Sequence, residues 1–126
     1  MAFVLAVNPT FRDVIHVEMR GETGKLERSS FVAEFKRLQL PELEELKAAV
    51  EKEAAELPPA EKWRAQASAM REVLVGWLEM VTADKKTVVE FNETNRELLL
   101  VIPQALTATQ LVFWTNSYGN GAREKN

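Results

Sequence analysis

The alternation of apolar and polar residues predicts an antiparallel β-hairpin near the start of the chain. Beyond a turn at Asn8-Pro9-Thr10, apolar side chains recur at alternate positions from Phe11 to Arg20, as in a half-buried strand. Gly21–Lys25 is a loop with two glycines, and a second alternating segment, Leu26–Leu38, follows it. Because two strands alone are marginally stable in water, we expect a third strand or a helix to cover this hairpin.

The next segment predicts an acidic helix that begins at Pro41 and ends at Pro58-Pro59. Residues 41–57 contain six glutamates against two lysines. Their apolar positions form a narrow stripe, which either covers the sheet or packs against a helix of another chain. Since the stripe is too short for a coiled coil, we favour packing within the molecule. The stripe consists of Leu43, Leu46, Val50, Ala54 and Leu57.

Residues 60–81 are predicted to form the longest helix, and the stretch Met70–Phe91, which begins within it, is the one around which the rest of the chain is organised. Its apolar residues recur at spacings of three and four, which places them on one helix face. Gly76 interrupts this stripe at a cost of roughly 1 kcal/mol relative to Ala. We interpret Gly76 as space for a neighbouring backbone beside Trp77, with a partner-docking surface as the alternative. The stripe comprises Trp63, Ala67, Met70, Leu74, Trp77, Leu78 and Val81.

A turn at residues 83–87 and a short strand, Val88–Phe91, are expected to lead into the last helices. Asn92 or Thr94 caps the first of these, since Thr94 and Glu97 have the spacing of a capping box. Pro103 splits the region, and a second helix runs from Pro103 to about Asn116. We expect Leu98, Leu99 and Ile102 to supply the buried side of the first helix.

These elements predict a single α+β domain over residues 1–118, in which a small N-terminal antiparallel sheet packs against three to four helices. The chain length of 126 residues and the 46% hydrophobic content are ordinary for one globular domain. Glycines at the end predict a mobile tail over residues 119–126. The expected structural core consists of Trp63, Met70, Leu74, Gly76, Trp77 and Phe91.

The residue types offer little for catalysis. The chain has no cysteine and a single histidine, His16, on the polar side of a predicted strand. A general base needs a nucleophile and an orienting group, and no such motif accompanies His16. No metal-ligand spacing occurs, and Gly21–Lys25 precedes a strand where a phosphate-binding loop would precede a helix. We therefore expect no catalytic residues, no metal and no cofactor.

The charge distribution and hydropathy limit the classes of partner. The net charge is −3, and no basic stripe exists that would neutralise a run of phosphates, so we expect no nucleic-acid partner. Leu98–Trp114 is apolar but is interrupted by Pro103 and polar residues, and it is too short for a membrane span. We expect a soluble intracellular protein.

Aromatic residues near the C-terminus are the more suggestive feature. Trp114 and Tyr118 lie at the end of the last predicted helix, where amphipathic rings often serve interfaces. Packing against the core or at the helix end is the alternative, which we favour because exposed aromatic patches are uncommon.

Read together, these segments resemble the tail assembly chaperones of long-tailed bacteriophages and prophages. Members of this family share an N-terminal strand pair, a Phe-Lys-x-Leu followed by an acidic helix, a central Gly-Trp and a Leu-Leu-x-x-Ile-Pro helix. The turn after Gly-Trp is usually Asp-Gly, whereas this chain has Asp84-Lys85-Lys86. The resemblance covers nearly the whole chain through short motifs. They are FVLAVNPTF at Phe3–Phe11, FVAEFKRL at Phe31–Leu38, VLVGWLEMV at Val73–Val81, VVEFNETNRELLLVIPQAL at Val88–Leu106, and the ending AREKN.

The resemblance implies a function without catalysis. Such proteins bind the hydrophobic tape-measure protein, keep it soluble, help to recruit tail-tube subunits, and leave before the virion is finished. It thus implies action in the bacterial host cytoplasm and absence from the mature virion. Homo-oligomerisation is left open. The candidate partner-binding residues are Leu43, Leu46, Val50, Trp114, Tyr118 and, in the basic tail, Arg123 and Lys125.

Two other classes compete with this interpretation. A structural head–tail connector, or another prophage protein-interaction module, would also lack catalytic residues, but a connector would remain in the purified particle. A small enzyme would require that the unpaired carboxylates converge in a cleft.

Overall fold

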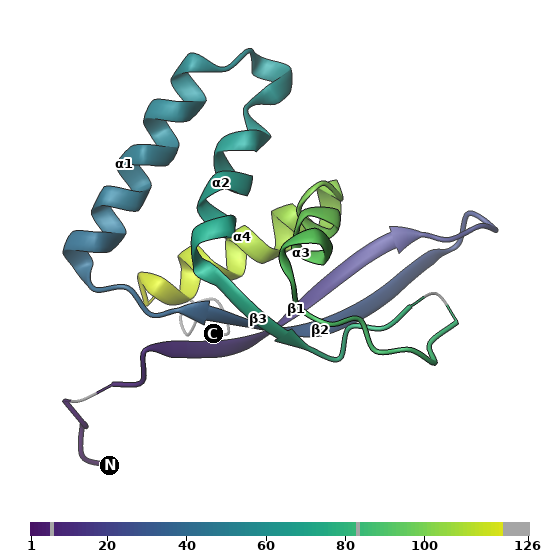
Figure 1. The fold of residues 1–126 in the computed structure, drawn as a ribbon, viewed down its shortest axis with the longest axis horizontal. Coiled ribbons are helices and arrows are strands. Elements are labelled where there is room, and N and C mark those ends of the chain that lie inside the picture. The colour runs from purple at the N-terminus through teal and green to yellow at the C-terminus, as the bar shows by residue number, and fades with distance from the viewer. Residues whose placement is uncertain (6, 83, 120–126) are drawn as a thin grey trace.

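Two long strands, β1 (Thr10–Arg20) and β2 (Leu26–Lys36), pair antiparallel in the computed structural model, which describes residues 1–5, 7–82 and 84–119. A shorter strand, β3 (Leu74–Leu78), pairs antiparallel with the other side of β2, so the strand order is β1-β2-β3. The helices gather on one face of this sheet (Figure 1). The fold is therefore α+β, as the sequence predicts.

The hairpin has the predicted alternation. Side chains on one face of β1 and β2 point into the core, and those on the opposite face are exposed or half-buried. The strands are joined by a loop in which Gly21 N–H donates to the Lys25 carbonyl at 3.0 Å. Because the turn fixes the register, the buried apolar residues of both strands lie together on the helix side of the sheet. They are Ile15, Val17, Phe31, Ala33 and Phe35.

The acidic helix, α1 (Leu40–Glu56), begins near Pro41 and ends before Pro58, as predicted. The Gln39 N–H donates to Glu42 Oε1 at 3.3 Å, which satisfies a free donor at the helix start. A short 3₁₀ turn, η1 (Pro59–Glu61), connects α1 to α2 (Trp63–Val73). The two helices pack against each other and rise together from the sheet (Figure 1).

The prediction of one helix over residues 60–81 is wrong. The helical part ends at Val73, and the Gly76-Trp77 segment is β3. Register with β2 shifts between Glu34 and Phe35, where a β-bulge leaves Val75 without a partner. The bulge places both Leu74 and Trp77 on the buried face of the sheet, although an undisturbed strand would place residues three apart on opposite faces.

Gly76 lies opposite Glu34 on β2, and this position differs from the one expected for a helix glycine. A Cβ at Gly76 would lie 3.3 Å from Glu34 Oε1, so the close neighbour is a side chain and not a second backbone. Glu34 in turn accepts a hydrogen bond from Thr10 Oγ1 at 2.9 Å and pairs with Arg12 at 3.5 Å. Gly76 therefore leaves room for a polar cluster across the open face of the sheet.

After β3 the chain makes a second, irregular hairpin. Val81 and Val88 form an isolated antiparallel bridge, and Val89 N–H donates to the Met80 carbonyl at 2.8 Å. The predicted strand Val88–Phe91 is thus present only as this short pairing. At the turn, Lys85 takes a φ of 62°, the left-handed conformation that favours glycine.

The last two helices are α3 (Glu93–Leu100) and α4 (Pro103–Ser117). Asn92 is the N-cap of α3, since its side chain accepts from Asn95 N–H at 2.8 Å, and Thr94 lies inside the helix. Pro103 begins α4 as expected. Helix α4 contacts β1, α2 and α3 and so closes the core over the sheet.

The described core agrees with part of the predicted one. Met70, Leu74 and Trp77 are buried, and Phe91 is partly buried against them. Trp63 is a correction: at the start of α2 it is 39% exposed and stacks with the Arg64 guanidinium at 5.0 Å.

A second correction concerns α3. Leu99 is buried and Ile102 partly so, but Leu98 is 61% exposed and Leu100 takes the buried position. The buried face of α3 therefore contains Leu100 in place of Leu98.

No single helix in the described ranges is long and apolar enough to cross a membrane. Helices α3 and α4 meet those criteria only when taken together, and they are bent by 101° at their junction. Of the predicted mobile tail, residues 119–126, only Gly119 is described, with a φ of 74°, and residues 120–126 lie outside the described residues.

Trp77→Ala is expected to lower the free energy of unfolding by about 3–5 kcal/mol, because a buried indole is removed and a cavity is left. The indole contacts the ring of Phe91 edge-on at 4.9 Å and donates a hydrogen bond to the Val89 carbonyl at 2.9 Å. Urea denaturation measures the change. Trp63→Ala is the matched control and should cost less than about 1 kcal/mol; equal losses for both variants would refute the burial of Trp77.

Lys85→Gly is expected to stabilise the protein by about 0.5–1 kcal/mol. A left-handed backbone costs a non-glycine residue roughly 1–2 kcal/mol, part of which the greater chain entropy of glycine offsets. Lys86→Gly is the control, since Lys86 does not have a positive φ and its N–H donates to Asp84 Oδ1 at 2.9 Å. Thermal unfolding measures the two variants. An equal fall in melting temperature for both would contradict the left-handed conformation of Lys85.

Candidate partner-binding surface

The apolar stripe of α1 is used within the molecule. Leu43 and Leu46 are buried in the core, and Val50 is partly buried against it. These three residues were candidates for contact with a partner, and the structure corrects Leu43 and Leu46 because their side chains have almost no surface to offer. The stripe packs within the molecule, as favoured from the sequence, and its main contact is with α2.

Trp114 and Tyr118 join the end of α4 to the other helices. Their rings stack with centroids 6.3 Å apart, and the Trp114 indole N–H donates to Gln66 Oε1 at 3.0 Å. The Tyr118 hydroxyl donates to Glu44 Oε1 at 3.2 Å, and partial burial together with this carboxylate raises the pKa of Tyr118. Both rings are only partly buried, so they serve packing first and leave limited surface for a partner. The last two partner candidates, Arg123 and Lys125, lie outside the described residues.

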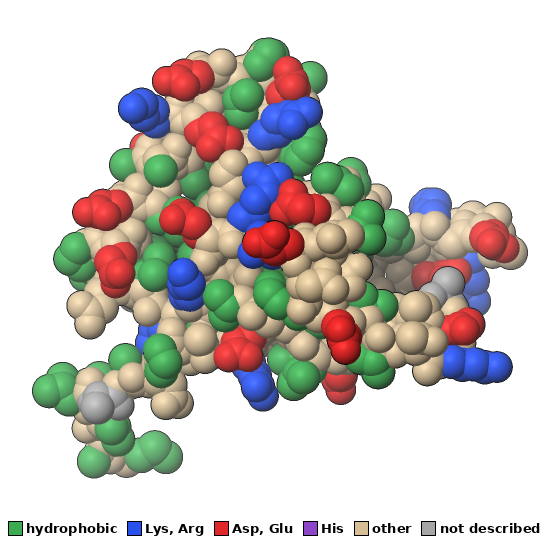
Figure 2. Space-filling model, viewed as in Figure 1, with side chains coloured by type: hydrophobic (Ala, Val, Ile, Leu, Met, Phe, Trp, Pro, Cys, Tyr) green, Lys and Arg blue, Asp and Glu red, His purple; other side chains and the backbone are tan. Residues whose placement is uncertain are grey.

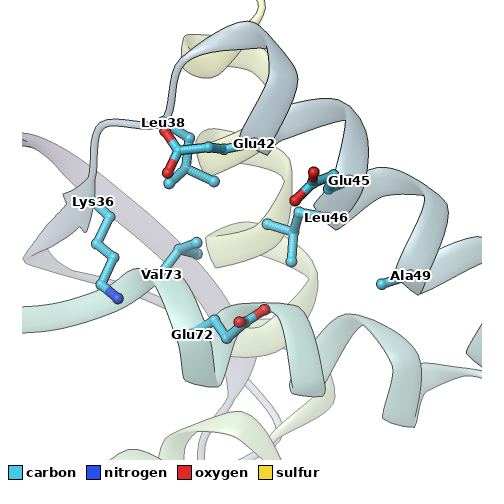
Figure 3. Close-up of a pocket in the computed structure, with 8 residues that line it drawn as sticks. All are labelled: Lys36, Leu38, Glu42, Glu45, Leu46, Ala49, Glu72 and Val73. Carbon is cyan, nitrogen blue, oxygen red and sulfur yellow. The ribbon is translucent and has the colours of Figure 1, made fainter.

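An open cleft of about 430 Å³ lies between the first part of α1 and the end of α2 (Figure 3). Half of the lining residues are apolar, namely Leu38, Leu46, Ala49 and Val73, and the other half are charged. The carboxylates come from both helices and the single cation from the end of β2. In the described ranges, no group of three His, Cys, Asp or Glu side chains is placed to hold a metal ion. The charged lining consists of Lys36, Glu42, Glu45 and Glu72.

A second surface, at the bend between α3 and α4, is apolar and exposed. We call it the elbow surface and define it by Trp63, Val81, Leu98 and Val101, which are 39%, 46%, 61% and 56% exposed. Hydrophobic side chains are visible in this region, to the right of the charged cluster on α2 (Figure 2). Exposed apolar patches of this kind mark sites of interaction with other molecules.

Two hollows indent the elbow surface. The larger, about 330 Å³, lies where the start of α2 meets the bend, and no charged residue lines it. The smaller, about 150 Å³, lies between α3 and the hairpin that follows β3, and its walls include Val81 and Leu98. Leu98 in the last turn of α3 and Val101 at its C-cap are three residues apart, so the two hollows are adjacent at the end of this helix. The larger hollow is lined by Trp63, Leu100, Val101, Pro103, Leu106 and Thr107.

The elbow surface borders the longest uncharged part of the described chain. No Asp, Glu, Lys, Arg or His occurs from Leu98 to Gly119, although 28% of all residues are charged. The exposed positions of α4 are Pro103, Gln104, Thr107, Leu111 and Asn116, none of which is charged. A partner that buries this surface therefore desolvates few charges, which favours an apolar partner.

A charged cluster fixes α3 against α2 at the rim of the elbow surface. The Arg71 Nε donates to both Glu97 oxygens, at 2.9 and 2.8 Å, and Arg96 Nη1 donates to the Arg71 carbonyl at 3.0 Å. The hydrogen bond from Arg71 holds the pKa of Glu97 below its usual range, and the same bond raises the pKa of Arg71. Leu98 follows Glu97 directly in the sequence, so the elbow surface begins beside this cluster.

Sequence reasoning missed most of the elbow surface. The spacing predicts Trp63 and Val81 on the apolar face of one helix and Leu98 on the buried side of the helix that precedes Pro103. Their spacing was compatible with burial, and only the tertiary arrangement separates Leu98 from Leu100. The uncharged stretch that follows Leu98 was the available signal, because charged residues are expected on the exposed positions of a surface helix.

Comparisons with known proteins identified no relative of this chain. No family model matches, and neither a curated protein nor a solved structure shows significant similarity.

Glu97→Gln is expected to lower the free energy of unfolding at pH 7 by at most about 1 kcal/mol, since the Glu97 side chain is 42% exposed and solvent screens the pair. Because the pKa of Glu97 is depressed in the folded protein, its stabilising effect is present above the unfolded pKa. The difference between wild type and variant should therefore disappear as the pH falls through the folded pKa.

Urea denaturation over a pH series measures this difference. Glu90→Gln is the control, as Glu90 has no ion-pair partner among the described residues. A difference that stays constant down to pH 2 would show that Glu97 acts through packing and not through its charge.

Proposed function

We propose that this chain is a non-enzymatic tail assembly chaperone that binds the tape-measure protein of a long-tailed phage or prophage. The motifs described above motivate the family, and the elbow surface is the single observation on which the proposal rests. A tape-measure protein is a long helical chain with apolar faces, as the resemblance implies. An uncharged concave surface suits the apolar face of such a helix.

In this proposal the client helix lies along the bend between α3 and α4. Side chains spaced one helical turn apart on the client enter the two hollows beside Val101 and Leu98. The charged residues at the rim, among them Arg64 and Glu97, remain in water and set the orientation of the client. Recruitment of tail-tube subunits would follow on the client and needs no catalytic group, cofactor, nucleic acid or membrane.

The proposal places the protein in the cytoplasm of the bacterial host during assembly and outside the finished particle. A head–tail connector with the same fold is the competing function. The two differ in fate: a chaperone leaves the particle, whereas a connector is a component of it.

Co-expression with the tape-measure protein of the same phage or prophage tests this function. We expect the client to become soluble and to co-purify with the wild-type chain. Val101→Glu should abolish co-purification, because it places a charge between the two hollows, and its 56% exposure leaves the fold intact. Leu26→Glu is the matched control, with a similar exposure of 52% on the distal part of the hairpin, and should retain the client.

Two results would contradict the proposal. An insoluble client in the presence of folded wild-type protein would refute the chaperone function, and detection of this chain in purified particles would favour the connector. Equal retention of the client by Val101→Glu and Leu26→Glu would move the binding site away from the elbow surface.

A further inference from the structure

The N-terminal arm, defined here as residues 1–7 apart from Ala6, is apolar and exposed. Phe3, Val4, Leu5 and Val7 are 83%, 68%, 88% and 56% exposed. The arm extends away from the body of the molecule beyond the start of β1 (Figure 1). Its sequence has no charged side chain, so nothing in its composition favours contact with water.

The base of the arm is held firmly. Arg37 N–H donates to the Pro9 carbonyl at 2.8 Å, and Arg37 Nε donates to the Asn8 carbonyl at 3.0 Å. The Arg37 guanidinium also lies 5.3 Å from the centre of the Phe11 ring. These contacts direct the arm outward from a fixed point, which lowers the entropy lost when the arm binds a surface.

We propose that the arm of one copy of this chain packs its Phe3 and Leu5 side chains onto the elbow surface of a second copy. The arm and the elbow surface are both apolar and uncharged, and both lack cover in the described part of a single chain. Within one molecule the two surfaces lie apart (Figure 1). The arm extends from the start of β1, and the α3–α4 bend lies above the sheet, away from that end of β1. Exchange between copies buries both surfaces at once.

The edge of β1 is a poorer acceptor for the arm. Val14 N–H donates to Asp13 Oδ1 at 2.7 Å, and the other Asp13 oxygen accepts from Asn116 Nδ2 at 2.8 Å. The Val14 N–H, a donor that an added strand would need, is thus already satisfied in the middle of the edge. The end of α4 is attached to the same edge through Asn116. Such blocking of edge strands is a common means of preventing strand addition.

Self-association through the elbow surface has a consequence for the client. If the proposed function is correct, the arm of a neighbouring copy and the client helix use the same surface, so client binding separates the copies. This competition rests on the proposed function, whereas the arm exchange itself does not.

Sedimentation velocity of the full chain over a concentration series tests the exchange without any client. We expect the wild-type chain to associate. The double variant Phe3→Glu, Leu5→Glu and the single variant Val101→Glu should each associate at least about tenfold more weakly. Leu26→Glu, the exposed apolar control, should associate as the wild type does, and circular dichroism should show all variants folded.

Mixing the two defective variants gives the sharpest result. The arm variant keeps an intact elbow surface and Val101→Glu keeps an intact arm, so their mixture should restore association that neither shows alone. A monomeric wild-type chain, or unchanged association of the arm variant, would overturn the proposal. Loss of association in Val14→Glu alone would overturn it too, and would assign the contact to the open face of the sheet. Because no client is present, each of these results leaves the chaperone function to its own test.

Discussion

The pairing of β3 with β2 is the contact on which the rest of the structure depends. It joins a five-residue strand from the middle of the chain to the N-terminal hairpin, and the bulge beside Phe35 turns both Leu74 and Trp77 towards the helices. The Trp77 indole then contacts Phe31 from β2 and Phe91 from the segment before α3. Without this pairing, the C-terminal end of α2 would lose its attachment to the sheet, and the segment that leads into α3 would lose its contact with Trp77.

The same bulge explains why the sequence predicted a helix where a strand occurs. An undisturbed strand buries alternate residues, but the extra residue at Val75 lets positions three apart share the buried face, which is also the spacing of a helix. Local evidence for a strand existed in Gly76, a poor helix residue, and in the β-branched and aromatic neighbours. It was outweighed because the stripe of α2 continues in phase through Leu74 and Trp77. The hairpin and α1 were predictable, since a two-residue period and a proline-bounded helix have no such competing interpretation.

The elbow surface shows a different limit. Three consecutive leucines, Leu98 to Leu100, offer no pattern that says which of them is exposed. The orientation of α3, with Glu97 paired to Arg71 of α2 and with the bend before Pro103, leaves Leu100 facing the core and Leu98 facing outward. Both features join residues that are far apart in the sequence or depend on the angle between two helices. A charge-free stretch was visible, but only the fold separates its buried members from its exposed ones.

The way in which the core is filled decides where binding can occur. Helices α1, α2 and α4 turn their aromatic and aliphatic residues inward, including most of those that seemed suited to a partner. The tyrosine and tryptophan at the end of α4 are held by Glu44 and Gln66.

Apolar surface remains chiefly at the open face of the sheet, the N-terminal arm and the elbow surface. Of these, the arm and the elbow surface share the absence of charge, and two uncharged hollows indent the elbow surface. A concave uncharged surface accepts an apolar segment with little desolvation penalty, whichever chain supplies that segment. Competition between a neighbouring arm and a client would thus follow from the shortage of such surfaces on this small domain.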